Sequence, residues 1–355
     1  MAGSAWTALP DGAVRFELEP PPPEPPAPVV VADRLTKVYP GGVEAAKDVS
    51  LRAGAGEVVG VVGPNGAGKS TTLGMIATLL APTSGTAAIK GVPIADVDRV
   101  RPLLGVALQQ AGLDPLMTVR EHFRVQAALY RVPRPVAEAR SAELAERFDL
   151  GAYVDRLAGQ LSGGTARRLA LALALLGEPP VVVFDEPTAG LDPRSRRRLW
   201  ELVRELSGEG RTVLLSTQYL EEADLLCDRV YLIDGGSIVL SGTPEELKRR
   251  VGGATLRLAV GGSVEEAHAA LSDMNCSIEG DTLVIALSDD VSVAGAVLAR
   301  IQERGVDMRS IQVAEPTLDD VFLQFTGRSL EAEPLSGPGF DLGAAMQRGG
   351  GKKWR

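Results

Sequence analysis

The chain is poor in the residues that build disulfide frameworks and metal centres. Its 355 residues include only two cysteines, Cys227 and Cys276, and two histidines, His122 and His268. The cysteines show no CxxC or metal-type spacing, so they are expected to be buried or free thiols in a reducing compartment. The histidines lie far apart without neighbouring ligand residues, so each is expected to be structural. These shortages argue against a disulfide scaffold and against a metal held by cysteine or histidine.

Long apolar runs and a leader sequence are missing as well. No run approaches the roughly 18–20 apolar residues that span a bilayer. The start of the chain, MAGSAWTALPDGAVRF, has no basic segment followed by an apolar one, so it is not a signal peptide. Asp and Glu number 46 against 37 Lys and Arg, a formal charge of −9, which argues against nucleic acid as a main partner. The chain is therefore expected to be soluble and cytoplasmic, with docking on a membrane protein left open.

The sequence pattern predicts two folded domains between two flexible ends. Residues 1–28 end in EPPPPEPPAP, a polyproline-type spacer, and residues 331–355 form a Gly-rich tail. Residues 29–250 alternate short apolar runs such as EVVGVVG, VVVFDE and TVLLST with helical patterns, which predicts an α/β domain with a largely parallel sheet. In residues 251–330 the order β-α-β-β-α-β predicts a small accessory domain with a ferredoxin-like fold.

A glycine-rich loop supplies the first chemical motif. GPNGAGKS, residues Gly63–Ser70, fits G-x-x-x-x-G-K-[ST], follows the apolar run EVVGVVG and opens the helical pattern STTLGMIATLL. Glycines let backbone N–H groups curl around an anion, and the helix N-terminus adds partial positive charge. We expect Lys69 to reach the β- and γ-phosphates of a nucleotide and Ser70 to ligate Mg²⁺. A chance turn is the alternative, and the strand before the loop and the helix after it argue against that.

Two adjacent carboxylates end the run VVVFDE. Asp185 is expected to be the second Mg²⁺ partner, held through water or through Ser70. Glu186 lies one residue beyond, where a carboxylate can orient and deprotonate a water. An ordinary acidic junction between strand and loop is the alternative, and the phosphate loop makes it the weaker interpretation.

The order of the motifs resembles a known family. LSGG, residues Leu161–Gly164, lies upstream of VVVFDE and AGLD, and the chain from 30 to 245 resembles the ATP-binding subunit of ABC transporters. The resemblance implies a P-loop NTPase fold with a parallel-sheet core, an antiparallel β subdomain and a helical subdomain. It also implies that Gln109, or the adjacent Gln110, touches Mg²⁺ and senses a membrane domain. The residues that it implies at the metal are Ser70, Gln109 and Asp185. Those that it implies at the nucleotide are Tyr39, stacked on adenine, and Gly63, Pro64, Asn65, Gly66, Ala67, Gly68, Lys69, Ser70, Thr71, Ser162, Gly163, Gly164 and Asp192.

The LSGG loop has a physical reason to bind phosphate. Ser-Gly-Gly before the helical pattern TARRLALALALL makes a second anion-binding helix N-terminus. One chain already has a phosphate cradle, so the second is best explained as facing the nucleotide of a partner, with two chains enclosing two ATP molecules. A plain helix cap with Gly turns is the alternative. Thr165 stands where the family usually has Gln, and we interpret it as tolerated variation.

Within the family, the chain is most similar to the daunorubicin/doxorubicin-resistance type of drug-exporter ATPase. STQYLEEAD resembles that group's switch region, and EPTLDDVFLQFTGRSL, residues 315–330, resembles its C-terminal hallmark. Thr317 is expected to cap a helix, with Asp320 answering three residues later. The helix would pack on its own small domain or form a docking or dimerisation face. Its apolar residues share one side at helical spacing: Leu318, Val321, Phe322 and Phe325.

Gln218 breaks the family pattern, which usually has His at the end of TVLLST in contact with the γ-phosphate. A Gln amide donates a hydrogen bond but does not titrate. Because Lys69, Ser70, Asp185 and Glu186 are all present, Gln218 is expected to orient the γ-phosphate as a catalytic residue beside Glu186 and Lys69.

The resemblance implies an ATPase that powers export of a drug-like or lipid-like compound through a separate transmembrane permease. It would act as a homodimer, or with a paralogue, on the inner face of the cell membrane. A soluble ABC-type ATPase in translation or DNA maintenance, or an importer ATPase, are the alternatives. The basic run Arg194–Arg198 suits the solvated start of a helix better than a nucleic-acid patch.

Overall fold

The computed structural model describes residues 5–8, 14–17, 28–109, 112–251, 254–271, 276–286 and 293–326. Gln110, most of the polyproline spacer and the Gly-rich tail lie outside these ranges. Near the start of the chain, β1 (Ala5–Ala8) and β2 (Val14–Glu17) pair as a small antiparallel ribbon.

A six-stranded sheet forms the centre of the molecule, in the order β12-β11-β5-β10-β9-β8. Its neighbours are parallel except for the pair β11 and β12, so the predicted largely parallel sheet is confirmed. The strands are β5 (Val58–Val62), β8 (Leu104–Ala107), β9 (Val181–Asp185), β10 (Thr212–Thr217), β11 (Arg229–Asp234) and β12 (Ser237–Gly242).

Alternate residues of the central strands fill two separate cores. Val182 and Phe184 of β9 belong to the core shared with the helices on one face, and Val181 and Val183 belong to the core on the other face. Because both faces are covered, the central strands read as continuous apolar runs rather than as alternating ones. Besides the last helix, described below, the helices that contribute to the first core are α3 (Val119–Leu129), α4 (Arg134–Arg147), α5 (Gly163–Leu175), α6 (Pro193–Gly208), α7 (Leu220–Leu226) and α8 (Pro244–Val251).

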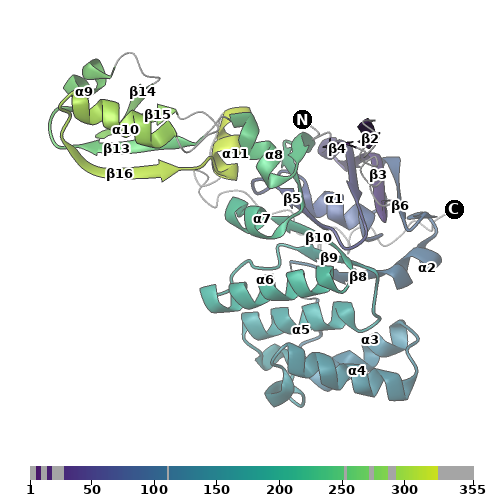
Figure 1. Ribbon diagram of the computed structural model, residues 1–355. Helices are drawn as coiled ribbons and strands as arrows, with labels where there is room; N and C mark the ends of the chain where they lie inside the picture. Colours follow the sequence, from purple (N-terminus) through teal and green to yellow (C-terminus); the bar gives the residue numbers. More distant parts are fainter. Residues whose placement is uncertain are drawn as a thin grey trace.

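An antiparallel sheet covers the second core, with α1 (Lys69–Ile76) packed between the two sheets (Figure 1). This sheet has the order β4-β3-β6-β7. The helix ends four residues before the predicted Leu80, since Thr78 adopts a left-handed backbone with φ 59°. The remaining elements are β3 (Val30–Tyr39), β4 (Val43–Ala53), β6 (Ser84–Ile89), β7 (Val92–Pro93), α2 (Val97–Val100) and the short 3-10 turns Arg101–Leu103, Gly151–Tyr153 and Ala158–Gln160.

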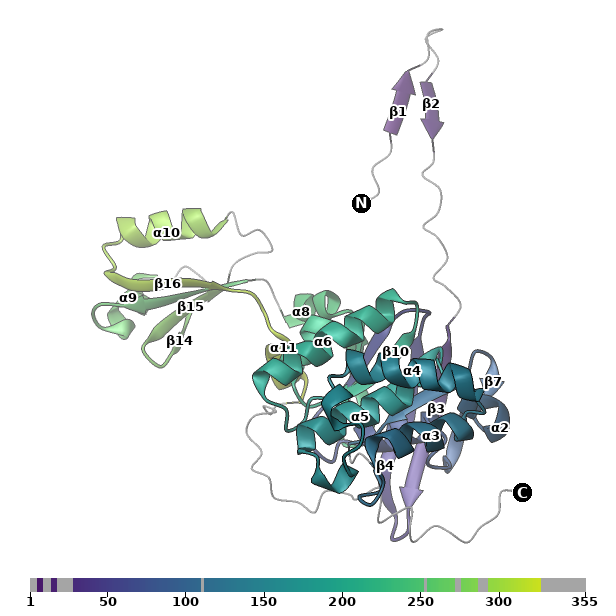
Figure 2. The ribbon, with the colours of Figure 1, turned by 90° about the horizontal axis from the view of Figure 1, so that it is seen from below.

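The accessory unit, which comprises residues 255–314, projects away from the rest of the molecule (Figures 1 and 2). Its antiparallel sheet has the order β14-β15-β13-β16, the arrangement that a ferredoxin-like β-α-β-β-α-β unit requires. Leu256, Leu258, Leu283 and Ile301 form the centre of its own core. Its elements are β13 (Thr255–Val260), α9 (Val264–Ala270), β14 (Cys276–Glu279), β15 (Thr282–Ala286), α10 (Val293–Glu303) and β16 (Met308–Ala314).

The last helix, α11 (Leu318–Thr326), does not pack on the accessory unit. Its side chains Leu318, Val321 and Phe322 are buried in the large core beside α7 and α8. Phe325, predicted on the same apolar face, is 45% exposed. The alternative that this helix packs on its own small domain is therefore wrong, while the domain bounds 251–330 stay a prediction. The predicted cap is present: the Thr317 hydroxyl accepts from the Asp320 backbone N–H.

Candidate active site

The carboxyl ends of four neighbouring strands carry the predicted site residues. The phosphate loop follows β5, Gln218 follows β10, Asp185 ends β9, and Gln109 lies two residues beyond β8. Because parallel strands end at the same edge of a sheet, segments far apart in sequence meet there.

The phosphate loop depends on glycine where it turns into α1. Gly68 is the N-cap of α1 with φ 101°, a left-handed conformation that L side chains rarely adopt. A Cβ atom at this position would lie 2.2 Å from the Ala45 carbonyl oxygen. The close approach of β4 and the left-handed backbone therefore both require glycine, and the loop is held tightly against the antiparallel sheet.

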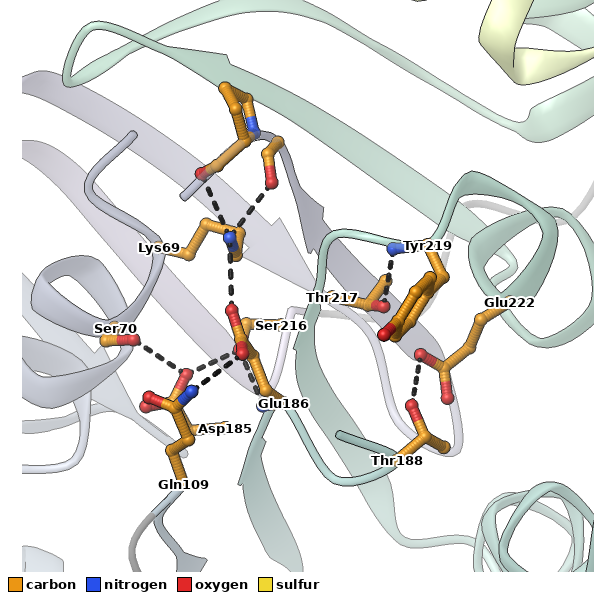
Figure 3. Close-up of polar contacts among 12 residues, drawn as sticks. Lys69, Ser70, Gln109, Asp185, Glu186, Thr188, Ser216, Thr217, Tyr219 and Glu222 are labelled. Carbon is orange, nitrogen blue, oxygen red and sulfur yellow. Dashed lines mark hydrogen bonds and ion pairs between the residues drawn. The ribbon is translucent and has the colours of Figure 1, made fainter. Parts of the chain in front are cut away.

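Lys69 is almost fully buried beneath this loop. Its Nζ donates hydrogen bonds to the carbonyl oxygens of Gly63 at 2.9 Å and Pro64 at 3.0 Å. The same Nζ lies 3.2 Å from Glu186 Oε1 (Figure 3). The ammonium group thus lies between the phosphate loop and the carboxylate that follows β9.

Asp185 is held by two serine hydroxyls. Ser70 Oγ donates to Asp185 Oδ1 at 3.0 Å, and Ser216 Oγ donates to the same oxygen at 2.5 Å (Figure 3). Ser216 Oγ also accepts the Glu186 backbone N–H at 2.9 Å. Sequence reasoning missed Ser216, although its place one residue before the end of the strand next to β9 was a usable signal.

The carboxylate of Glu186 is oriented from two sides. Gln109 Nε2 donates to its Oε2 at 2.9 Å, while Lys69 contacts its Oε1. Its backbone has φ 46°, a left-handed conformation in a non-glycine residue that costs on the order of 1–3 kcal/mol. Such strain is kept where the surroundings fix a side chain in one direction, which suits a group that must aim at a reacting water.

Arg167 on α5 was not singled out by the sequence, yet it ties this edge together. It is 6% exposed, and its guanidinium donates to five backbone carbonyls. Burial lowers the pKa of Arg167, and the nearby carboxylates act in the opposite direction. The helix behind LSGG is thereby fixed to the segment after β8 and to the end of β9. The five acceptors belong to Leu108, Gln109, Asp185, Glu186 and Pro187.

Tyr39 lies beside α1, with its hydroxyl 3.5 Å from Thr71 Oγ1. Lys37 Nζ lies 5.5 Å from the centre of its ring, and the residue is only 9% exposed. Burial raises the pKa of the Tyr39 hydroxyl. Stacking on adenine requires an open ring face, so this residue would have to turn outward to play the predicted role.

The LSGG and AGLD loops meet each other on the surface. Ser162 caps α5 by accepting the Thr165 backbone N–H at 3.2 Å, and Ser162 and Gly163 are exposed. A Cβ at Gly164 would lie 3.7 Å from Leu191 Cδ2, so the two loops are neighbours.

Asp192 caps α6 and is itself exposed. It accepts the backbone N–H groups of Arg194 and Ser195, each at 3.0 Å, and the Ser195 hydroxyl at 2.6 Å. The hydrogen bond from the Ser195 side chain is the largest cause that lowers the pKa of Asp192. In this structure its carboxylate serves the helix cap, and the nucleotide contact stays a prediction.

The predicted residues therefore form two groups. Lys69, Ser70, Gln109, Asp185 and Glu186 are joined by hydrogen bonds and an ion pair at the sheet edge. The LSGG and AGLD loops adjoin each other, and their residues are exposed or partly exposed. Gln218 follows β10 and is half-buried.

The oxygen donors of the first group suit a hard cation. Mg²⁺ is usually held by one or two protein oxygens together with water and substrate phosphates, and the Ser70 hydroxyl and Asp185 carboxylate provide such oxygens side by side. Over the described ranges, no cluster of three or more His, Cys, Asp or Glu side chains offers a fuller cage. None of the helices in that part of the chain is both long and apolar enough to cross a membrane.

Two family models match the chain. One, described as ABC transporter, matches residues 46–189. The other, described as ATP-binding protein DrrA1-3-like, C-terminal domain, matches residues 242–326. The second match runs from the end of β12 through the accessory unit to the last residue of α11.

Similar proteins extend over most of the chain. The daunorubicin/doxorubicin resistance ATP-binding protein DrrA of Streptomyces peucetius is 42% identical over 300 residues, covering 82% of this chain and 91% of that protein. The Nod factor export ATP-binding protein I of Rhizobium etli is 37% identical over 300 residues, covering 84% and 93%. A solved ATP-binding cassette, described as dimeric and post-hydrolysis with ADP and Pi, has a TM-score of 0.57 and 29% identity, covering 60% of this chain and 98% of that one.

Proposed function

Because the chain belongs to the ABC transporter family of ATP-binding proteins and is an ATPase of that family, we propose that it is the energy-supplying subunit of an exporter. Two copies, or one copy and a paralogue, enclose two ATP molecules and drive a drug-like or lipid-like compound through a separate transmembrane subunit. The chain works at the inner face of the cell membrane, docked on that subunit. Its ABC ATPase fold agrees with the expectation from sequence.

One observation carries the proposal: Lys69, Glu186 and Gln109 form a continuous chain of contacts beside the pair Ser70 and Asp185. A phosphate cradle, metal oxygens and a directed carboxylate are the parts that phosphoryl transfer to water requires.

Lys69 supplies positive charge to the β- and γ-phosphates of ATP. Its present partners are two loop carbonyls and one oxygen of Glu186, and phosphate oxygens compete for the same ammonium donors. Ser70 and Asp185 would hold Mg²⁺, with Gln109 beside them. A bound Mg²⁺ would supply positive charge to the phosphates.

Glu186 orients the attacking water and accepts its proton. Once Lys69 turns to phosphate, Oε1 of this carboxylate is released, while Gln109 still holds Oε2. Gln218 donates from its amide to the γ-phosphate at the neighbouring strand end, and it does so without taking up a proton.

The exposed LSGG loop supports the two-chain arrangement. Ser162 and Gly163 stand at the solvent-facing N-terminus of α5, where unpaired backbone N–H groups attract an anion. The nucleotide that they contact is the one held in the partner's phosphate loop. The AGLD loop beside them, with Asp192, crosses the same interface.

Export is favoured over import, translation and DNA maintenance by what the relatives are named for. DrrA of Streptomyces peucetius is named for drug resistance and protein I of Rhizobium etli for Nod factor export. Both are similar to this chain through the accessory unit as well as the ATPase part, since each match covers more than four-fifths of the chain.

Co-purification with the membrane protein encoded next to this gene tests the proposal. The purified chain should hydrolyse ATP with Mg²⁺, bind that protein in vesicles, and hydrolyse faster when drug-like compounds are added. A neighbouring gene for a soluble solute-binding protein, together with no binding to an exporter-type permease, would contradict export and favour import.

A further inference from the structure

Glu222 is a buried carboxylate outside the phosphate and metal cluster. It lies on α7, is 1% exposed, and accepts hydrogen bonds on both oxygens. Thr188 Oγ1 donates to Oε2 at 3.0 Å (Figure 3), and the indole Nε1 of Trp200 donates to Oε1 at 3.0 Å. The Thr217 side chain also acts on this carboxyl and lowers its pKa. One carboxylate on α7 thus joins α6 and the loop after β9, and α7 itself begins two residues after Gln218.

Two of these partners belong to the loops that carry the proposed catalytic side chains. Thr188 follows Glu186 by two residues and precedes the AGLD loop, whereas Thr217 directly precedes Gln218. The hydrogen bond from the Glu186 backbone N–H to Ser216 Oγ already joins the two strand ends. The Glu222 carboxylate adds a second connection, farther along both loops.

Opposing effects act on the Glu222 carboxyl. Burial raises the pKa of its carboxyl, while its hydrogen bonds and the charge of Arg196 act in the opposite direction. Arg196 also lies over the Tyr219 ring at 4.9 Å. The pKa of the buried Cys227 thiol is raised by burial and, to a smaller extent, by the charge of Glu222. Removing the acceptor would leave buried donors unpaired, which is costly.

Packing of α7 does not need this carboxylate. Leu220, Ala223 and Leu226 of the same helix are already buried in the large core. Burying a charged group costs free energy unless it is fully hydrogen-bonded, so an apolar residue would serve packing alone more cheaply. A fully satisfied buried network, by contrast, fixes one arrangement of the elements that it joins.

We propose that Glu222 is a positioning residue for ATP hydrolysis, which holds the loop of Glu186 and the loop of Gln218 at the spacing that the reaction needs. This inference rests on the proposed function, because it assigns Glu222 to the same site. It acts through Thr188 and through α7, which follows the Gln218 loop, and touches no substrate atom.

Glu222→Met tests the proposal because it keeps the volume and removes both acceptor oxygens. In the full-length chain with Mg²⁺ and ATP, kcat should fall between about ten- and a hundred-fold, the cost of a small misplacement at a reacting centre. KM for ATP should change less than about two-fold, since Lys69 and the phosphate loop hold the nucleotide. Glu222→Gln should recover most of kcat, because an amide oxygen still accepts and hydroxyl partners can rotate to accept from its NH₂.

Glu221→Gln is the matched control, since it makes the same change one residue earlier at an exposed position, and its kcat should equal that of the parent. Thr188→Val, which removes one donor, should lower kcat on its own. Added to Glu222→Met it should lower kcat no further if both act through the same link. If the Met variant does not fold, the Val variant alone tests the inference. A folded Met or Val variant with unchanged kcat would overturn the inference while leaving the proposed function intact. If the parent chain itself hydrolyses no ATP, the proposed function fails first.

Discussion

The edge of the central sheet that carries Lys69, Asp185 and Glu186, called the ATP edge below, is built differently from the accessory unit. At the ATP edge, buried ionisable side chains such as Lys69, Arg167 and Glu222 connect segments far apart in sequence. In the accessory unit, neighbouring antiparallel strands surround a small apolar core, and Ile311 and Val313 on its edge strand β16 are 45% and 42% exposed. The first arrangement orients polar side chains, as catalysis requires. The second forms a small domain with a partly exposed edge strand.

The helix α11 returns the chain from the accessory unit to the large core. The chain leaves the large core after α8, forms the accessory unit, and returns to the same core through Leu318, Val321 and Phe322. The accessory unit is thus held at both of its ends.

The largest expected effect falls on the ATP edge. Glu186→Gln should lower the rate of ATP hydrolysis by roughly 10²–10⁴-fold, the usual contribution of a positioned general base. ATP binding should persist, because the amide leaves the phosphate loop and metal oxygens in place. Single-turnover hydrolysis and nucleotide binding measured on the same sample would check this. Hydrolysis close to that of the parent would show that another group activates the water.

The next-largest effect is expected on stability, at the helix α11 that follows the accessory unit. Phe322→Ala should lower the free energy of unfolding by about 3–5 kcal/mol, the usual cost of truncating a buried Phe. Its kcat at a temperature where it is folded should remain that of the parent. Phe325→Ala, at the 45% exposed position three residues later, is the control and should change stability by less than about 0.5 kcal/mol. Denaturant unfolding measures both, and equal effects would mean that α11 does not dock as described.

Gln218 gives a smaller and more specific effect. Gln218→Ala should reduce turnover roughly ten- to hundred-fold, because the γ-phosphate loses a hydrogen-bond donor to a charged group. Gln218→His should stay active, since the imidazole restores a donor. Steady-state hydrolysis of both variants at neutral pH decides the matter. An alanine variant as fast as the parent would remove Gln218 from the reaction.

The smallest effect concerns pH and stability. Burial raises the pKa of Glu222 above its ordinary value of 4.5, so between these two values the folded chain binds more protons than the unfolded chain. The parent therefore loses stability as pH rises through that window, and Glu222→Gln, which cannot titrate, does not. The melting temperature of the Gln variant minus that of the parent should increase as pH rises from 4.5 and become constant above the raised pKa. A difference independent of pH would contradict this.

Sequence patterns predicted most of the fold and the sheet edge at which the site residues lie. Runs such as VVVFDE and TVLLST mark strands because both faces of the sheet are covered, and their ends place Asp185 and Gln218 at one edge. Arg167 and Ser216 were not predictable, since periodicity does not say which carbonyl or carboxylate a side chain meets across elements. Likewise, helical spacing showed that α11 has an apolar face but not which core that face would join.

The central claim is that each ATP is held by the cradle of one chain and the LSGG loop of another. It is tested most directly by mixing two inactive variants, Glu186→Gln and Gly163→Asp. Gly163 is exposed, and a Cβ there meets nothing within 4 Å, so the acidic residue should repel phosphate without harming the fold. The two variants mixed should regain ATP hydrolysis, because a mixed dimer has one site with an intact cradle and an intact LSGG loop. Mixing Glu186→Gln with Lys69→Ala, which damages the cradle in both chains, should regain none. If the first mixture stays as inactive as the second, the site is not shared between two copies of this chain.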